Sequence, residues 1–200
     1  MTRAYDMTLR AKRAAGTTER ITDAAEALLT EGPLAATTLK AIAARADVTV
    51  QTVLRHMGSR DGCLEAVGRR IAARVDDQRG RSEPGDVDAA IEDLVAHYEA
   101  EGRLVLNLLA QEHGNDPLAR RAAESGRAYH RAWVQRCFAP WLGDEQGGRR
   151  DHAADGERLD ALVAATDLYV WKLLRLDLGR SREATEATVR RLVRAVLEAS

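Results

Sequence analysis

The segment between residues 37 and 64 constrains the fold more than any other stretch, because it predicts two short helices joined by a tight corner. It reads TTLKAIAARADVTVQTVLRHMGSRDGCL. Thr37 and Thr38 are favourable residues for a helix start. The apolar residues that follow recur at helical spacing, namely Leu39, Ile42, Ala43 and Ala46. Asp47 then ends the first helix, since aspartate tolerates the left-handed backbone that a tight turn needs.

A second helix is predicted to begin after Thr49, which is again a good N-cap residue. Helical spacing turns Val53 inward and leaves Gln51, Thr52 and Arg55 outside. A small residue at 43, a turn residue at 47 and an apolar residue at 53 have the spacing of a helix-turn-helix. The outer side chains are long and polar enough to reach base edges in a major groove. The alternative, from spacing alone, is an ordinary surface helix.

Thr38 through Leu64 also resembles the DNA-binding segment of TetR-family transcriptional regulators, which often read close to TT-x-x-x-IA-x-x-AGVS-x-x-TLY-x-HF-x-S-K-x-x-L. The segment lies near the N-terminus of a 200-residue chain, as is usual in that family. The matching residues are Thr37, Thr38, Ile42, Ala43, Ala46, Val48, Thr49, Thr52, His56, Ser59 and Leu64. The resemblance implies a DNA-binding domain followed by a variable helical body whose last two helices commonly dimerise.

Four positions depart from that pattern. Asp47 replaces the usual turn glycine, Leu54 a tyrosine, Met57 a phenylalanine and Arg60 a lysine. In the family the tyrosine commonly contacts a DNA phosphate, a hydrogen bond that leucine cannot make. Leu54 is therefore expected to serve packing, with Arg55 taking over a phosphate contact.

The net charge of the chain is −1, so DNA affinity would have to come from a local basic patch. Residues 1–20 provide one, with five basic side chains against two acidic ones. We predict that residues 1–16 form a flexible basic arm, in which Arg13 and its neighbours contact phosphates or an adjacent minor groove. A disordered tail is the alternative.

Cysteine usage and hydropathy bear on the compartment. Cys63 and Cys137 are far apart and lack the spacing of metal ligands, which favours buried thiols in a reducing compartment. No apolar run approaches about 18 residues and no signal peptide is visible. We therefore expect a cytoplasmic protein with no membrane partner. No motif indicates a cofactor, and His97, His113 and His130 lie on separate predicted helices, so no metal site is expected.

The fold class predicted is all-α: a three-helix helix-turn-helix domain at residues 17–62 and a helical effector-binding and dimerisation domain at 63–200. A linking helix over 60–79, capped by Ser59, would carry the ligand signal. The body is expected to contain a helix from Asp86 to a break at Gly102, a short helix over 104–109 and a helix from Pro117 to about Trp141. A loop over 143–156 would follow, then a helix over about 157–178 and a last helix capped by Ser181.

An effector pocket is expected among the helices spanning residues 86–175. Asn107 and Gln111 would supply its hydrogen bonds. Its walls would come from Tyr98, Tyr129, Trp133, Cys137 and Trp171, although each of these is also compatible with an ordinary core position. No buried charged cluster is evident in the sequence, which favours a largely apolar or aromatic effector.

The predicted helix over about 157–178 carries more apolar surface than one subunit's core requires, and the last helix carries a narrower apolar seam. Two such helices favour a four-helix interface with a second copy over burial within one chain. We therefore predict a homodimeric, ligand-responsive regulator, with repression favoured, that binds a palindromic double-stranded operator. Its major-groove contacts would be Thr38, Thr49, Gln51, Thr52, Arg55 and His56, with Arg60 on a phosphate. The alternatives are a helical ligand sensor that acts through a protein partner and a small helical enzyme.

Overall fold

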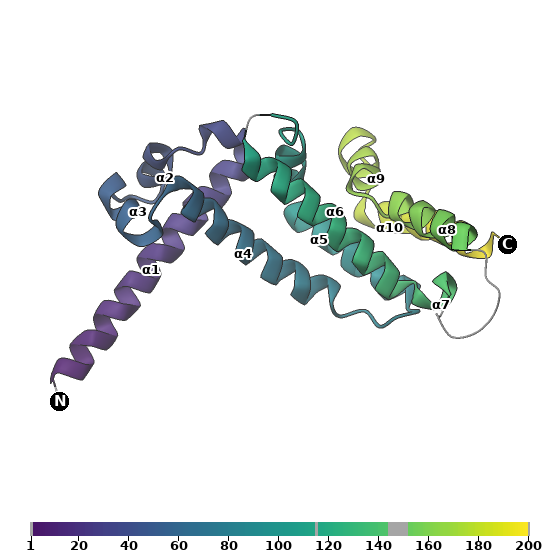
Figure 1. Cartoon of the computed structure of the whole chain (residues 1–200), viewed down its shortest axis with the longest axis horizontal. Coiled ribbons are helices and arrows are strands. Elements are labelled where there is room, and N and C mark those ends of the chain that lie inside the picture. The colour runs from purple at the N-terminus through teal and green to yellow at the C-terminus, as the bar shows by residue number, and fades with distance from the viewer. Residues whose placement is uncertain (1, 115, 144–151, 200) are drawn as a thin grey trace.

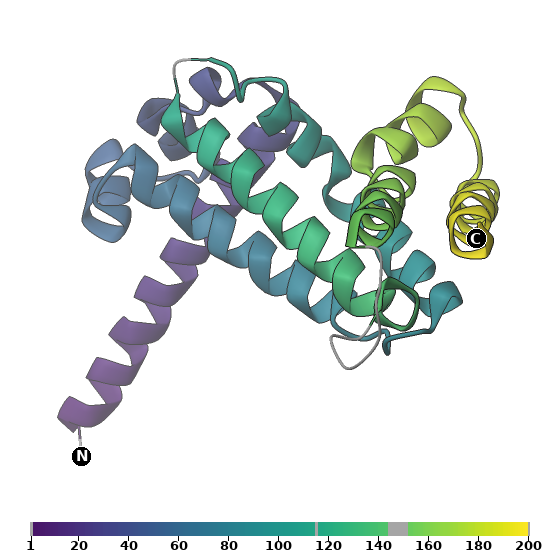
Figure 2. The same cartoon turned by 45° about the vertical axis from the view of Figure 1, so that its right-hand side comes forward.

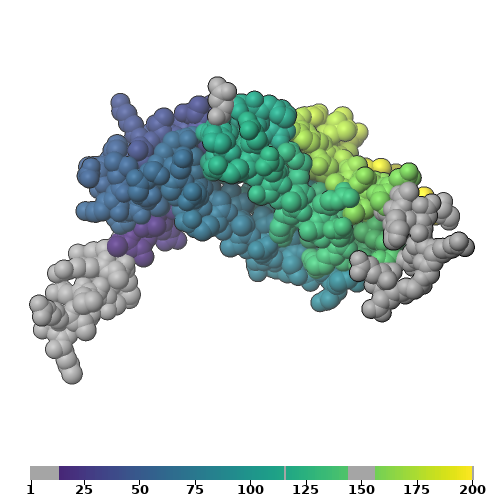
Figure 3. Space-filling view, in the orientation of Figure 1, coloured from purple at the N-terminus to yellow at the C-terminus, as the bar shows by residue number. Residues whose placement is uncertain are grey.

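The computed structural model describes the backbone of residues 2–114, 116–143 and 152–199, and the side chains of these ranges except 2–13 and 152–155. Every regular element in these ranges is helical, which confirms the predicted all-α class. The molecule is elongated, with the N-terminal helices gathered at one end and the C-terminal helices at the other (Figures 1 and 3). No described helix is long and apolar enough to span a bilayer.

The first element, α1 (Thr2–Glu31), is longer than the sequence predicts. A helix is expected only from Thr17, after a separate arm, but the backbone is helical from Thr2. Residues 2–15 contain no proline and are rich in alanine, arginine and other good helix formers. Gly16 lies within the helix, in open space where an added Cβ would meet no atom within 4 Å. The N-terminal half of α1 consequently projects away from the other helices (Figures 1 and 2).

The predicted helix-turn-helix is formed by α2 (Leu39–Arg45) and α3 (Val50–Met57), preceded by a short 3-10 turn, η1 (Leu34–Ala36). Both N-caps are confirmed: the Thr38 side chain accepts a hydrogen bond from the Ala41 amide, and Thr49 accepts one from Thr52. Asp47 adopts the left-handed conformation expected of it, with φ 53°. The aspartate thus closes the corner where glycine is usual in the family.

Helix α4 (Arg60–Arg79) begins behind the cap of Ser59 and runs from the DNA-binding end into the body beside α5 (Val87–Leu109) and α6 (Pro117–Cys137). The predicted break at Gly102 is wrong, since α5 continues through it. A Cβ at that position would lie 2.7 Å from the ring of Trp171. Glycine is therefore needed for close approach of a neighbouring side chain and not to end the helix.

The C-terminal elements also differ from the prediction. The long helix ends at Cys137, and a separate turn, α7 (Ala139–Leu142), follows it. In place of one helix to Leu178, the chain forms α8 (His152–Ala165), α9 (Leu168–Lys172) and a π-helical turn, η2 (Leu173–Asp177). The break arises because Asp167 caps a new helix, its side chain accepting from the Tyr169 amide. Most of the predicted 143–156 loop lies outside the described residues, and α10 (Arg182–Glu198) is capped by Ser181 as expected.

Two apolar cores are present, and the first does not stop at the predicted boundary after residue 62. The core of the DNA-binding end surrounds Ile21, Ile42 and Val53, but it also contains Leu104 from α5 and Ala119 from α6. The second core fills the body around Tyr98, Trp133, Leu162 and Val193. The helix-turn-helix end is therefore packed directly on the body, in addition to being joined to it through α4.

Candidate nucleic-acid interface and its connection to the helical body

The outer face of α3 is the part of the molecule best suited to reading DNA. Val53 is fully buried, which fixes the rotation of the helix, and Gln51 and Arg55 are exposed on its other side. Within the described residues no ion pair involves Arg55. An amide and a guanidinium on one exposed helical face are the donor types that pair with adenine and guanine edges.

Two of the three predicted threonine contacts serve first as helix caps. Thr38 and Thr49 each accept an amide hydrogen bond at the start of α2 and α3, and the Thr49 and Thr52 hydroxyls lie 2.9 Å apart. Thr38 and Thr49 remain exposed and Thr52 is half-buried. Backbone amides and hydroxyls at a helix N-terminus are suited to phosphate oxygens.

His56 is half-buried, and its Nδ1 lies 3.0 Å from the hydroxyl of Thr18 on α1. This bond connects the end of α3 to α1 and leaves only the Nε2 side of the ring for another partner. Leu54 is also half-buried, yet it is not among the residues packed on the core of this domain. The expectation that Leu54 serves packing stays a prediction, supported so far by its half-buried side chain.

Arg60 is placed differently from its predicted phosphate-binding role. Its Nε donates to the Thr37 carbonyl and one Nη donates to the Leu34 carbonyl, both at 2.8 Å. The same guanidinium lies 3.3 Å from the carboxylate of Asp116, which caps α6. These bonds occupy the donors of Arg60 and connect α4 to η1 and to the start of α6. The predicted contact of Arg13 falls on a side chain outside the described residues.

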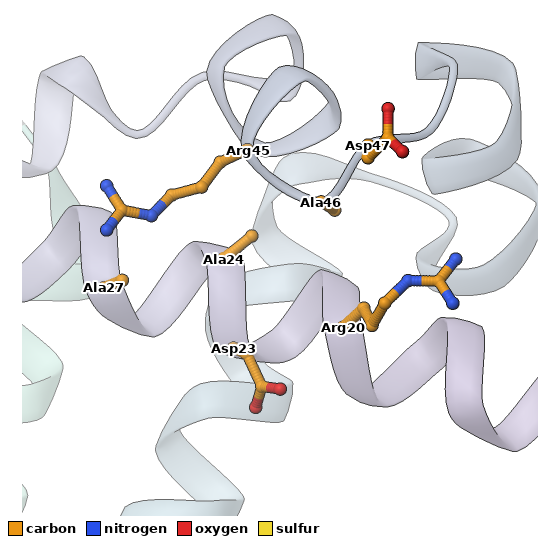
Figure 4. Close-up of a pocket in the computed structure, with 7 residues that line it drawn as sticks. All are labelled: Arg20, Asp23, Ala24, Ala27, Arg45, Ala46 and Asp47. Carbon is orange, nitrogen blue, oxygen red and sulfur yellow. The ribbon is translucent and has the colours of Figure 1, made fainter.

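A surface pocket lies between α1 and the corner of the helix-turn-helix (Figure 4). It is lined by Arg20, Asp23, Ala24, Ala27, Arg45, Ala46 and Asp47. Arg45 forms a two-pronged ion pair with Glu31 at 2.6 Å, and Asp23 is paired with Arg70. The side chains of the pocket thus carry both signs of charge, and two of them are paired with residues outside it, which does not suit a buried effector.

A chain of ion pairs connects α1 to the body through α4. Arg74 of α4 binds Glu26 of α1 at 2.6 Å and the buried Glu101 of α5 at 2.7 Å. Arg70, one turn earlier, also reaches Glu26. Three helices therefore share charged contacts at one level of the molecule, so a displacement of α4 relative to α5 would be felt by α1.

Asn107 and Gln111 are bonded to the N-terminal end of the molecule and not to the aromatic residues predicted as walls of the pocket. The Asn107 side-chain amide donates to the Leu29 and Thr30 carbonyls at the end of α1, and the Gln111 Oε1 accepts from the Leu34 amide at 2.9 Å. Both side chains therefore fasten the end of α1 and the start of η1 to the C-terminal end of α5 and the turn that follows it. Sequence spacing places them on one face of the helix, but it does not show which element that face meets.

Three of the predicted wall residues are brought together, and they surround an arginine that the prediction missed. The guanidinium carbon of Arg79 lies 4.1 Å from the Trp133 ring centroid, 5.6 Å from that of Tyr129 and 5.9 Å from that of Tyr98. Only 3% of Arg79 is exposed. The expectation of a largely apolar or aromatic effector rested on the absence of a buried charged cluster from the sequence, and it did not take this single buried cation into account.

Arg79 was detectable in the sequence. It continues the apolar stripe of α4, one turn beyond Val75, so helical periodicity places it on the buried face. Cys137 and Trp171 are also buried in the body core, but the indole of Trp171 packs on Gly102 and donates to Glu99 at 2.8 Å.

Two histidines face Arg79 and remain neutral. The pKa of His130 and that of His97 are each lowered to about 3, first by burial and then by the Arg79 charge. Because a guanidinium can only donate, the 2.8 Å contact makes His130 Nδ1 the acceptor, which places the ring proton on Nε2. That nitrogen lies 3.1 Å from the Thr166 hydroxyl, which donates to the Leu162 carbonyl.

Comparison with known proteins agrees with this architecture. The model of the tetR family of bacterial regulatory proteins matches residues 21–67, which span the second half of α1, the helix-turn-helix and the start of α4. A search of curated proteins gives no match. The fold is similar to the crystal structure of a transcriptional regulator from Rhodococcus sp. Rha1, with a TM-score of 0.67 and 16% identity over 90% of this chain and 96% of that one. Residues 21–67, which include the helix-turn-helix, therefore have the sequence of the tetR family of bacterial regulatory proteins, and the chain as a whole shares its fold with the regulator from Rhodococcus.

Proposed function

We propose that this regulator reads its operator with the exposed face of α3 as a homodimer, represses transcription and is released by an effector bound in the body. The observation that carries DNA reading is the exposure of Gln51 and Arg55 on a helix held from behind by the buried Val53. Thr49 and Thr38 at the helix starts, with the Nε2 side of His56, are the proposed flanking contacts. Arg60 is left out of the proposed contacts because its donors are occupied.

Arg55 offers a direct test by fluorescence anisotropy with the duplex upstream of the protein's own gene. Arg55→Ala should weaken binding by about 1–3 kcal/mol if Arg55 reads a base, or reduce the salt slope by about one unit if it holds a phosphate. Arg69→Ala is the matched control, since the side chain of Arg69 is 73% exposed on α4. Identical binding curves for Arg55→Ala and the native protein would remove Arg55 from the interface.

The dimer is proposed on the apolar side chains that the C-terminal elements leave uncovered. These are Tyr169, Leu173, Leu178 and Leu192, between 42% and 55% exposed. The underside of the same elements packs in the body core through Leu168, Trp171 and Val189. Large apolar side chains on both sides of a helical layer favour a second contact on the outer side, here with a second copy.

Leu192 and its exposed neighbour Arg191 provide a matched pair for testing the dimer. Leu192→Arg should shift the mass measured by light scattering from two chains toward one, because a charge would be buried in the interface. Arg191→Lys should leave the dimer intact. A native protein that is monomeric at all measured concentrations would contradict this part of the proposal.

A ligand signal would pass along α4. Its start is bonded to η1 and to Asp116, and its middle is paired with α1 and α5. An effector that favours a different tilt of α4 would change the position of α3 in each subunit and shift the population away from DNA.

A further inference from the structure

We propose that the guanidinium of Arg79, within the rings of Trp133, Tyr98 and Tyr129, is the binding site for an organic carboxylate, the anionic group of an aromatic or aliphatic effector. The inference deepens the proposed function and rests on it only in calling the ligand an effector. Arg79 is the last residue of α4, so the site lies where the connecting helix enters the body (Figure 1).

The first support is an unbalanced buried charge. Within the described residues no carboxylate forms an ion pair with Arg79, although the other buried or half-buried arginines of α4, Arg60, Arg70 and Arg74, each have one. Taking an isolated cation out of water is costly, and buried charges in proteins are normally paired. The three rings compensate in part, through attraction between the cation and their faces.

The second support is a pair of nitrogens without partners. Arg79 Nε is buried and makes no hydrogen bond, and the same is true of His97 Nδ1. His97 is 5% exposed, and its ring lies 5.3 Å from that of Tyr98. Buried donors in native structures are seldom left unsatisfied, and those that are call for a missing partner. A carboxylate that accepts from the Nε edge of Arg79 would supply one and could take the place of His130 at the neighbouring Nη.

The surroundings favour one negative charge on an apolar molecule. The nearest other cation, Arg136, donates to the Arg79 carbonyl at 2.6 Å and to the Ser82 carbonyl at 2.9 Å, so it is already bound. His97 and His130 are neutral. One guanidinium can hold a carboxylate in a two-pronged geometry and balances its single charge, whereas a doubly charged phosphate would leave a negative charge buried without a partner. The indole and phenol rings suit an apolar remainder.

The site is also placed to act on α4. The Arg79 carbonyl accepts from the Trp133 indole at 3.2 Å and from Arg136, so the end of α4 is fastened to α6 at the residue that would hold the ligand. Tyr129, the half-buried ring of the three, is the side nearest to solvent. A carboxylate drawn in beside it would compete for the Arg79 side chain and alter the seating of this helix end on α6.

The test uses the full chain without DNA, with benzoate and hexanoate as probes and with benzamide and hexanamide as uncharged counterparts. The carboxylates should raise Tm by about 3–6 °C at roughly ten times their Kd, and they should change the fluorescence of Trp133, whereas the amides should do neither. Arg79→Met should abolish the response and Arg79→Lys should weaken it. Arg81→Met is the control, because Arg81 is 65% exposed and paired with Asp77.

Three results would overturn the inference. They are equal Tm shifts with the acid and the amide, a carboxylate shift that survives in Arg79→Met, and no Tm shift with either acid at about 10 mM, which is about ten times a millimolar Kd. If Arg79→Met does not fold, the inference is still tested by two comparisons. One is between acid and amide in the native protein, and the other is between the native protein and Arg79→Lys. DNA binding is measured separately. A negative carboxylate result therefore leaves the proposed DNA reading standing, and absent DNA binding leaves a positive carboxylate result standing.

Discussion

Helix α4 begins and ends with an arginine, and the two guanidiniums have opposite surroundings. Arg60 donates to two carbonyls and faces the carboxylate of Asp116, so its charge and its donors are satisfied. Arg79 is more deeply buried, faces aromatic rings and neutral histidines, and has an unsatisfied Nε. We infer that Arg60 holds its end of α4 permanently to neighbouring elements, whereas Arg79 at the other end can bind a ligand reversibly.

The largest expected effect concerns pH and arises only at the Arg79 end. His97 and His130 have pKa values lowered to about 3 in the folded state, so below about pH 6.5 the unfolded chain binds protons that the folded chain does not. Stability should therefore fall as pH drops, by about 3–4 kcal/mol for both residues together between pH 7 and 5. Urea unfolding at a series of pH values measures this.

The comparison makes the pH effect specific. Arg79→Met removes one cause of the lowered pKa values and should flatten the profile between about pH 5 and 7. The paired carboxyl groups Glu31, Glu99 and Glu112 have pKa values held below the ordinary value of 4.5 by their arginine partners, so they titrate below this window. A profile with no slope between pH 7 and 5 would show that the histidines are not buried as neutral rings.

Arg60 provides the next largest effect. Arg60→Met leaves two carbonyls and Asp116 without their donor, and it should cost about 2–3 kcal/mol of unfolding free energy. Arg69→Met, on the exposed side of the same helix, should change stability by less than about 0.5 kcal/mol. If both variants unfold at the same urea concentration as the native protein, Arg60 does not hold α4 in place.

Two alanine substitutions compare a tightly packed glycine with an exposed one. Gly102 of α5 lies against Trp171, whereas Gly68 of α4 faces open space. Gly102→Ala should destabilise the protein by about 1–2 kcal/mol, because the new methyl group would clash with Trp171 and outweigh the better helix propensity of alanine. Gly68→Ala meets no atom within 4 Å and should stabilise by about 0.5–1 kcal/mol. Opposite signs confirm the close approach in α5, and equal signs contradict it.

Arg79→Met gives the smallest change and separates the two ends most sharply. Removal of an unpaired buried charge should leave the ligand-free protein at neutral pH as stable as before or more stable by about 1 kcal/mol. The backbone bonds to Trp133 and Arg136 remain in this variant. If Arg79→Met loses as much unfolding free energy as Arg60→Met, the contacts of Arg79 with the aromatic rings stabilise the fold, and Arg79 has a structural role.

The sequence prediction was accurate for interactions within one segment and inaccurate for contacts between distant helices. Caps and corners depend on residues three or four positions apart, and those of Thr38, Thr49, Ser59 and Asp47 were correctly predicted because the interaction is written within the segment. The effector residues depend on helices far apart in the chain. Asn107 and Gln111 were placed on one helical face, but α5 ends at Leu109 and Gln111 lies in the turn that follows it. Their partners are the end of α1 and the amide of Leu34, which spacing along the chain does not reveal.

Glycine and arginine account for the remaining errors. Gly102 was interpreted as a helix break because local propensity ignores the Trp171 ring, which comes from a helix 69 positions later. Arg79 was overlooked because arginines are mostly exposed, although its position continued the buried stripe of α4. Charged residues on an apolar stripe are thus the signal that would have improved the site prediction.

The most direct test of the central claim is selection of bound sequences from a pool of random duplexes by the purified protein, followed by anisotropy measurements at several salt concentrations. The account predicts enrichment of a palindromic sequence, bound with a steep salt dependence and lost in Arg55→Ala. If the folded protein enriches no sequence, or binds the selected and the unselected duplexes equally, α3 does not read DNA in this chain.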